Sequence, residues 1–517
     1  MNEAPVVKLY FQKLCDEFVQ LRELQKSKKK KDNGTDVEVE VFIDRTIGKI
    51  EEIRNWEKNS RLSAMRAALL YEKSKSLIAR KEEKLAQDIL IKILKDLKDI
   101  ALEREVIFIV MRVRNHIAYF LCKEENYVEA RKILEIAGDD YETLKKNNSV
   151  MEFFTSEELF CVAPETDTSN KLERLVTNNF QMLAFISNKL GLHDKFAEYH
   201  HMVLDRQLMT KENDVAMWAI KSAKLALYLF EANRFKEAKH HLLAAVRVLK
   251  LDEKNWKNDK KDKEFENTFA NIAKCWIKYG LALFDASKAK SLSIFQKQKN
   301  PMFGNLLATN KLLNSEESMN KNDNNNQDTK LTNSKTADYQ GPYLFYESIN
   351  LSLVEDEVDS TLVESTNDAR SLFNYIYSWY EQAVAFYTLQ DHPMEFLNTN
   401  LDLCELYGYL AFYEEDIESQ YELQKFRADI LESLIIVVKE IKPQCYISIL
   451  IETLKELAEI QVEMMSLNLR RIYAVKETQS VGNIVSCKMG AICSIHSCLE
   501  QFGNSIIHLE ASCHNFE

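Results

Sequence analysis

Four residues near the C-terminus carry side chains that could bind zinc, namely Cys487, Cys493, His496 and Cys498. Structural zinc sites usually hold cysteines in closely spaced pairs, two to four residues apart. Here the three gaps contain five, two and one residues, unlike a zinc knuckle. We therefore predict no metal site in this segment.

Two pairs of adjacent histidines, His200–His201 and His240–His241, also have metal-binding chemistry. Adjacent residues of a helix point about 100° apart, so neither pair can chelate an ion by itself. We expect these histidines to lie on polar helix faces.

The sequence offers no constellation of catalytic residues. No two glycines lie close enough for a phosphate-binding loop, and His-Glu-x-x-His, Cys-x-x-Cys and EF-hand patterns are absent. The 80 acidic residues give no pair that stands out as an acid and base. We predict no catalytic residues, no cofactor and no enzymatic activity.

Apolar residues outside the core stripe indicate binding rather than catalysis. In residues 177–190 the core stripe is Phe180, Leu183, Ala184 and Ser187, and Met182 and Phe185 lie off it. In the next hairpin Trp218, Ser222, Leu225 and Leu229 form the stripe, while Lys221, Lys224 and Tyr228 point elsewhere. These residues line either the inner groove of a helical solenoid or the contact with a neighbouring helix.

The elements that position these residues must be helices. The 517 residues include only 11 Gly and 6 Pro, far below the roughly 12% that is usual for the two together. Sheets, barrels and phosphate loops need such residues in their turns. The composition therefore predicts an all-α fold.

A weak internal repeat indicates tetratricopeptide-like hairpins. An aromatic residue at 127 or 235 is followed by alanines three and ten positions later, and His193, Phe196 and Val203 fill an intermediate unit imperfectly. Small alanines allow two helices to approach closely. We predict a solenoid of helical hairpins, although chance or generic helix packing could explain any single unit.

Composition changes divide the chain into four parts. We expect an N-terminal helical-repeat lobe at 1–299, an Asn-rich disordered linker at 300–343, a C-terminal lobe at 344–476 and a divergent Cys-rich tail at 477–517. After the linker, helices are expected at 368–389, 401–442 and 446–472.

Charge and hydropathy restrict the class of partner and the cellular compartment that we expect. The net charge of −12 disfavours nucleic acid and suits a basic protein partner. No apolar run approaches the length that spans a bilayer. Scattered cysteines without an export signal indicate a cytoplasmic protein.

Several segments are distinctive in their order and spacing, namely 205–208, 218–220, 235–240, 273–279, 369–373, 410–414 and 442–446. The run Ala273–Tyr279 before a long polar stretch is the most specific of them. In this order and spacing the sequence resembles one family, the kinesin-binding proteins (KIF-binding protein).

This resemblance implies a two-lobed crescent of tetratricopeptide-like hairpins that grips the motor domain of selected kinesins in its concave groove. By holding the motor's microtubule-binding helix, such a protein blocks attachment to microtubules without turnover. Roles in microtubule-based transport, axon development and mitosis, and association with the cytoskeleton, are implied with it.

Gln207 matches the family's motor-contacting position at the end of its helix. Met182, Phe185 and Lys224 occupy equivalent groove positions but differ from the family's usual residues there, which bears on which kinesins are bound. With Lys221, these are the expected partner-binding residues. The alternative function is a tetratricopeptide adaptor for peptides or chaperone tails, in which Lys221 and Lys224 would clamp a terminal carboxylate.

Overall fold

The computed structural model describes residues 5–28, 35–54, 59–147, 153–162, 170–210, 214–251, 259–299 and 343–474, without 353, 356, 357 and 441–446. Within these ranges every regular element is a helix, and no strand occurs. The expected all-α fold is thereby confirmed. Two compact units divide the chain, unit 1 at Met1–Asn213 and unit 2 at Asp214–Glu517.

Unit 1 holds nine α-helices among its described residues, joined mostly as antiparallel neighbours. They are α1 (Pro5–Lys28), α2 (Thr35–Arg54), α3 (Ser60–Ala79), α4 (Glu83–Asp96), α5 (Ile107–Lys123), α6 (Tyr127–Asn147), α7 (Ser156–Leu159), α8 (Lys171–Lys189) and α9 (His193–Thr210), with a 3-10 turn at Lys98–Ile100. Unit 2 holds α10 (Val215–Glu231), α11 (Phe235–Leu251), α12 (Asp259–Lys299), α14 (Thr366–Phe386), α15 (Pro393–Tyr413), α16 (Ile417–Glu440) and α17 (Ile447–Ala474).

One turn type closes four of the hairpins. Lys81, Glu125, Gly191 and Asn233 all have φ between 59° and 68°, and each lies two residues before the second helix of its pair. The backbone N–H that follows this residue donates to a carbonyl in the last turn of the first helix, as from Arg234 to Leu229 at 2.8 Å. This left-handed cap satisfies the free carbonyls of the first helix and reverses the chain within two residues.

The repeat read from the sequence is confirmed, because α6, α9 and α11 begin at residues 127, 193 and 235. The alanines Ala130, Ala137, Ala238 and Ala245 are completely buried. Each of these helices packs closely on the helix before it, as the small side chains require.

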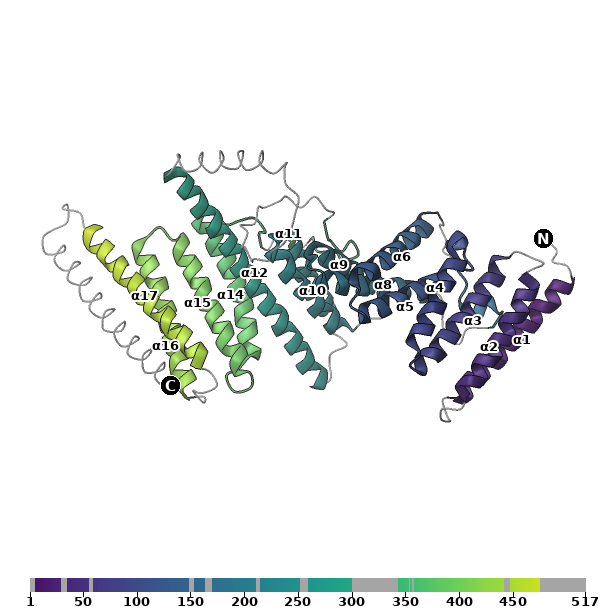
Figure 1. Cartoon of the computed structure of the whole chain (residues 1–517). Coiled ribbons are helices and arrows are strands. Elements are labelled where there is room, and N and C mark those ends of the chain that lie inside the picture. The colour runs from purple at the N-terminus through teal and green to yellow at the C-terminus, as the bar shows by residue number, and fades with distance from the viewer. Residues whose placement is uncertain are drawn as a thin grey trace, which may run out of the picture. The chain divides into compact units, whose positions relative to one another are not determined.

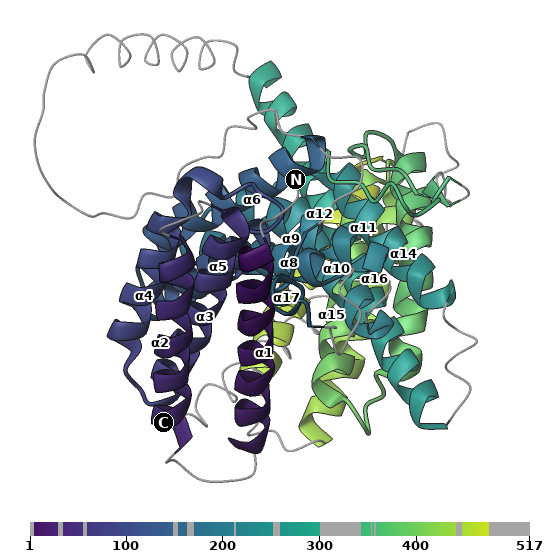
Figure 2. The ribbon, with the colours of Figure 1, turned by 90° about the vertical axis from the view of Figure 1, so that its right-hand side faces the viewer.

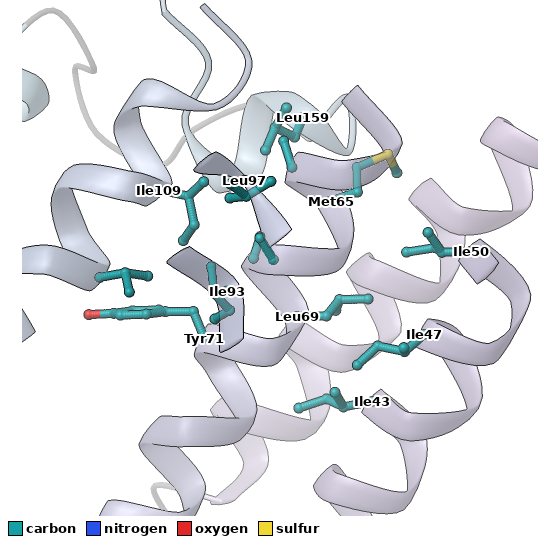
Figure 3. Packing of buried hydrophobic residues seen from close by; sticks show 14 of the residues in the cluster. Ile43, Ile47, Ile50, Met65, Leu69, Tyr71, Ile93, Leu97, Ile109 and Leu159 are labelled. Atoms are coloured by element: carbon teal, nitrogen blue, oxygen red, sulfur yellow. The ribbon is translucent and has the colours of Figure 1, made fainter. Parts of the chain in front are cut away.

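The core of unit 1 is built from one face of each successive helix. Ile43, Ile47 and Ile50 of α2 meet Met65 and Leu69 of α3 (Figure 3). On the other side of α3 lie residues of α4 and α5. Figure 2 shows α1 and α2 as upright helices of this unit. The apolar residues that recur at helical spacing therefore contact helices that are neighbours in the chain, as in a solenoid.

Helix α12 is the centre of unit 2. It packs against α10 and α11 before it and against α14 and α15 after it, and α14 to α17 then continue side by side (Figure 1). Trp276 of α12 is completely buried and stacks on Trp379 of α14 at 5.6 Å between ring centroids. The buried residues of the run Ala273–Tyr279 thus pack in the core of unit 2, which explains why their residue types are specific.

The segment 343–364 has little regular structure and is bound to α11 along its length. Glu237 accepts a hydrogen bond from the Leu344 N–H at 2.8 Å, and His240 Nε2 accepts one from the Tyr346 N–H at 2.9 Å. Lys239 donates to the carbonyl oxygens of Glu355 and Val358. Backbone groups that a loop would otherwise leave unpaired are satisfied by α11 side chains.

Two details differ from the sequence expectations. The single helix expected at 401–442 is two helices, α15 and α16, which are separated at residues 414–416. The border between units lies at Asn213–Asp214, whereas the expected lobe border is at 299. The four-part division and the crescent stay predictions, and the linker up to 342 and the tail lie outside the described residues.

Candidate partner-binding residues

Helix α8 exposes the two apolar residues that the sequence singles out. Its core stripe is buried as expected, with Phe180 and Leu183 at 4% and 1% exposure, whereas Phe185 is 49% exposed. Met182 is half-buried against the core of unit 1. Phe185 meets Tyr127 of α6 edge-on at 6.2 Å and lies under the Lys189 ammonium at 5.7 Å. About half of Phe185 is therefore available for contact, and Met182 presents part of its side chain.

Gln207 lies near the end of α9, half-buried, next to a residue that fixes this end of the helix. Arg206 forms an ion pair with Glu173 of α8, donates to the Tyr141 hydroxyl at 3.2 Å and lies 4.9 Å above the Tyr141 ring. Burial is the main cause that raises the pKa of Tyr141 to about 12, so its hydroxyl stays protonated. It donates to Glu173 at 2.7 Å. This network holds α9 against α6 and α8.

The network also fixes where Gln207 lies relative to the α8 residues. Arg206 Nε donates to Thr177 Oγ1 at 3.4 Å, so this end of α9 lies beside the first two turns of α8. Phe185 is eight residues further along α8, about 12 Å at the helical rise. Met182, Phe185 and Gln207 thus lie on one hairpin, but Gln207 lies at a different position along the hairpin axis from Met182 and Phe185.

Helix α10 in unit 2 carries both predicted lysines on one stripe, on which Lys224 is exposed and Lys221 is half-buried. Trp218, Ser222, Leu225 and Leu229 are all at most 2% exposed, as expected. Met217, Lys221, Lys224 and Tyr228 recur at helical spacing on another face, where Met217 is 48% exposed and Lys224 is exposed. The stripe combines two cations with two large side chains.

Lys224 lies beside Cys275 of α12. Burial raises the pKa of the Cys275 thiol to about 11, and the Lys224 and Lys274 ammonium groups oppose that rise. Cys275 is therefore an inert thiol at neutral pH. Lys224 is held over the α10–α12 contact, while Lys221 lies one turn earlier on α10.

The expectation that the paired histidines lie on polar faces is wrong for three of the four. His201, His240 and His241 are at most 8% exposed. His241 donates through Nδ1 to the Glu237 carbonyl at 2.8 Å, and His240 is enclosed by the segment 343–364. A partner more than a hundred residues away along the chain buries His240, so no local pattern could have revealed it.

Sequence reasoning also missed a cleft of about 1460 Å³ beside this segment. Phe235 and Lys236 at the start of α11, Lys290 of α12 and the carboxylates of Glu364 and Asp368 line it. Lys290 pairs with Glu364 at 3.0 Å, so the cleft carries both signs of charge. The segment 343–364 supplies part of its wall through Tyr343, residues 359–362 and Glu364.

Among the described residues, no three His, Cys, Asp or Glu side chains gather where they could hold a metal ion. The candidate residues Cys487, Cys493, His496 and Cys498 lie outside that part of the chain. None of the described helices has the length and apolarity needed to cross a membrane.

Three comparisons place the chain among known proteins. Residues 216–507 match the family described as KIF-1 binding protein C terminal. The chain is 28% identical to the KIF-binding protein of Danio rerio over 71% of its own length and 57% of the relative's. For the KIF-binding proteins of Drosophila melanogaster and Homo sapiens, the identities are 26% and 24%, over 62% and 75% of this chain and 51% and 62% of theirs.

A solved structure of a protein titled kinesin binding protein (KBP) aligns with 98% of this chain and 84% of its own, at a TM-score of 0.55 and 16% identity. That likeness concerns the fold. The family match includes much of the segment 477–517 that the sequence sets apart as divergent. Since the match covers more than half of the 517 residues, the chain belongs to the KIF-1 binding protein family.

Proposed function

We propose that this protein binds the motor domains of kinesins and thereby blocks or tunes their attachment to microtubules. The observation that carries the proposal is the family match over residues 216–507, together with relatives named KIF-binding proteins. Binding would be stoichiometric, through side chains on the hairpins, and would need no catalytic group.

The predicted residues suit such a partner. The exposed Phe185 offers an apolar contact, and the exposed Lys224 and half-buried Lys221 offer two cations for acidic positions. Gln207 is half-buried and adds a polar side chain. The net charge of −12 favours encounter with a basic surface, and a motor surface that binds acidic tubulin is basic. Aromatic anchors surrounded by polar groups are typical of protein interfaces.

The first test is a pull-down of the full chain against a panel of kinesin motor domains, followed by co-sedimentation of each bound motor with microtubules. We expect at least one motor to bind and to leave the microtubule pellet as the protein is added. If no motor binds and co-sedimentation is unchanged across the panel, the proposal is wrong.

Single substitutions test the predicted residues. Gln207→Ala and Phe185→Ala should each weaken motor binding about 5- to 30-fold, which corresponds to about 1–2 kcal/mol. Lys195→Ala is a matched control, because Lys195 is exposed at the other end of α9 and pairs only locally with Glu198 at 2.7 Å. Equal binding by all variants, with unchanged helicity, would remove these residues from the interface.

Lys224→Glu reverses one charge of the α10 stripe and should weaken binding about tenfold where the motor is acidic opposite it. Lys455→Glu on α17, where Lys455 is also exposed, controls for the change in net charge. The adaptor alternative predicts instead tight binding of a C-terminal acidic peptide that Lys221→Ala abolishes.

Roles in microtubule-based transport, axon development and mitosis, and a cytoplasmic, cytoskeleton-associated location, follow from the proposal rather than from separate observations. They require motor binding in the cell. A variant that fails to bind motors in vitro but restores transport in depleted cells would contradict this link.

A further inference from the structure

Two cysteines of unit 1 that are far apart in sequence meet at the contact between α1 and the turn after α7. Cys15 is 8% exposed on α1, and Cys161 is exposed at the end of α7. The Cys161 side chain lies close enough to Cys15 to raise the pKa of its thiol. Both are reduced in the structure, so they form a free dithiol.

Contacts on both sides of the cysteines hold them in register. Phe18 of α1, one turn after Cys15, stacks face to face on Phe160 at 4.1 Å between centroids. Arg22, one turn further, donates to Glu157 at 2.7 Å. Both rings are completely buried, so the two segments cannot separate without exposing core.

The turn itself aims Cys161 outward. Its φ is 54°, the same left-handed cap that closes the hairpins, and the Val162 N–H donates to the Glu157 carbonyl at 2.9 Å. A residue with a Cβ pays strain in this conformation, and the surrounding contacts maintain it. The turn thereby holds Cys161 at the surface.

A guanidinium group completes the cluster. Arg61 of α3 donates to the Leu159 carbonyl at 2.7 Å and to Cys161 Sγ at 3.0 Å. The exposed Cys161 sulfur therefore lies beside a cation, whereas the Cys15 side chain is buried. Burial is the main cause, and the neighbouring Cys161 the second, that raises the pKa of the Cys15 thiol to about 11, so Cys15 is protonated at neutral pH. The exposed thiol therefore reacts first.

We propose that Cys15 and Cys161 are a redox modification site that hydrogen peroxide converts to a disulfide joining α1 to the turn after α7. The Cys161 sulfur attacks one peroxide oxygen, the O–O bond breaks, and sulfenic acid and water form. The Cys15 sulfur then attacks the Cys161 sulfur, and the S–O bond breaks. Hydroxide leaves with the Cys15 proton as a second water, so two thiols and one peroxide give one disulfide and two waters.

The direct test treats the full chain with hydrogen peroxide, alkylates free thiols and digests it with trypsin without reductant. Cys15 falls in the peptide 14–22 and Cys161 in the peptide 147–171. We expect these two peptides to appear cross-linked and to separate after dithiothreitol. Recovery of an alkylated Cys15 together with an overoxidised Cys161 would overturn the proposal.

Variants separate the two steps. In Cys15→Ser, the sulfenic acid on Cys161 has no resolving thiol, so dimedone should label residue 161 strongly, whereas the wild type is labelled weakly. Cys161→Ser changes an exposed side chain and should abolish the cross-link without loss of helicity. Cys122→Ser, on α5 of the same unit, is the matched control and should cross-link like the wild type. Equal dimedone labelling of Cys15→Ser and the wild type would contradict a resolving role for Cys15.

Oxidation should also change stability. The disulfide would close a loop of about 146 residues, and cross-links over long loops restrict the unfolded chain most. We expect the unfolding midpoint of unit 1 to rise by about 5–10 °C on oxidation and to return after reduction. No rise in a chain shown to be cross-linked would mean that the bond strains the turn it joins.

Discussion

His240 shows how much a single residue of this fold depends on a distant segment. Its Nε2 accepts from the Tyr346 N–H, and its Nδ1 lies 3.3 Å from Glu355, so the ring is neutral with the proton on Nδ1. Burial lowers the pKa of His240, although Glu355 and Glu237 oppose this, and the nearby Lys239 ammonium lowers it further. A protonated ring would lose the acceptor that Tyr346 uses.

The stability of unit 2 should therefore fall at acidic pH. Below pH 6.5, the ordinary pKa of histidine, His240 of the unfolded chain takes up a proton, whereas folded His240, with its lower pKa, does not. The contribution of His240 to stability is therefore complete above pH 6.5 and decreases as the pH falls toward the folded pKa. His240→Gln keeps an acceptor but does not titrate. Chemical denaturation at about pH 7.5 and about pH 5.5 should show a smaller loss for this variant. The same loss in both proteins would exclude His240 as the cause.

Arg206 is the residue on which the position of Gln207 depends. Arg206→Ala removes the ion pair with Glu173, the hydrogen bond to Tyr141 and the stacking on its ring. We expect unit 1 to lose about 1–3 kcal/mol in the free energy of unfolding, measured by urea denaturation. Lys195→Ala should cost less than about 0.5 kcal/mol, because its pair with Glu198 is more exposed. A cost for Arg206→Ala as small as that of the control would show that the network contributes no stability.

At this scale the sequence predicted exposure well where it depends on one helix. The stripes through Phe180 and Trp218 are buried, and Phe185 and Lys224 are exposed. It failed for His240, because the segment that buries this residue is remote in sequence. Whether the five predicted residues contact a partner stays a prediction.

At the scale of elements, the hairpin turn was the least predictable feature. Three of its four left-handed positions hold Lys81, Glu125 and Asn233 rather than glycine, so the usual signal for a helix end was missing. The helix starts at 127 and 235 were nevertheless found, because the buried alanines recur at fixed offsets. The start at 193 was found although Phe196 and Val203 take the place of the alanines. The break between α15 and α16 was missed, since Glu414, Glu415 and Asp416 at the break include neither glycine nor proline.

Close packing between α12 and α14 gives a prediction at this scale. A Cβ added to Gly280 would lie 2.5 Å from Cγ1 and 2.9 Å from Cδ1 of Ile376, which is completely buried. Gly280→Ala should therefore destabilise unit 2 by about 1–2 kcal/mol, because overpacking exceeds the gain in helix propensity. Denaturant unfolding measures this cost.

Two comparisons make the measurement specific. Gly48 of α2 has nothing within 4 Å of an added Cβ, so Gly48→Ala should stabilise unit 1 by about 1 kcal/mol. In an Ile376→Ala background, Gly280→Ala should cost nothing, since the obstructing atoms are gone. An undiminished cost in that background would locate the strain elsewhere.

For the molecule as a whole, the sequence predicted the helical fold and the family, and the comparisons confirmed both. It did not predict that the chain on the two sides of residues 300–342 shares one core. Composition shows where a chain stops burying apolar surface, but not whether the flanking parts return to each other. Here the flanking parts do return to each other, since Trp276 and Trp379 lie 103 positions apart and stack.

That shared core has a consequence for how unit 2 is assembled. α12 contacts both α10–α11 and α14–α15. The two parts are therefore joined by side-chain packing and not only by the peptide bonds within 300–342. A specific protease site inserted there should, once cut, leave two fragments that co-elute in native buffer and separate in denaturant. Separation in native buffer would mean that buried area alone cannot hold them. If they stay together, the unit can be reconstituted from two separately made pieces, and a reporter could be inserted between them without disturbing either.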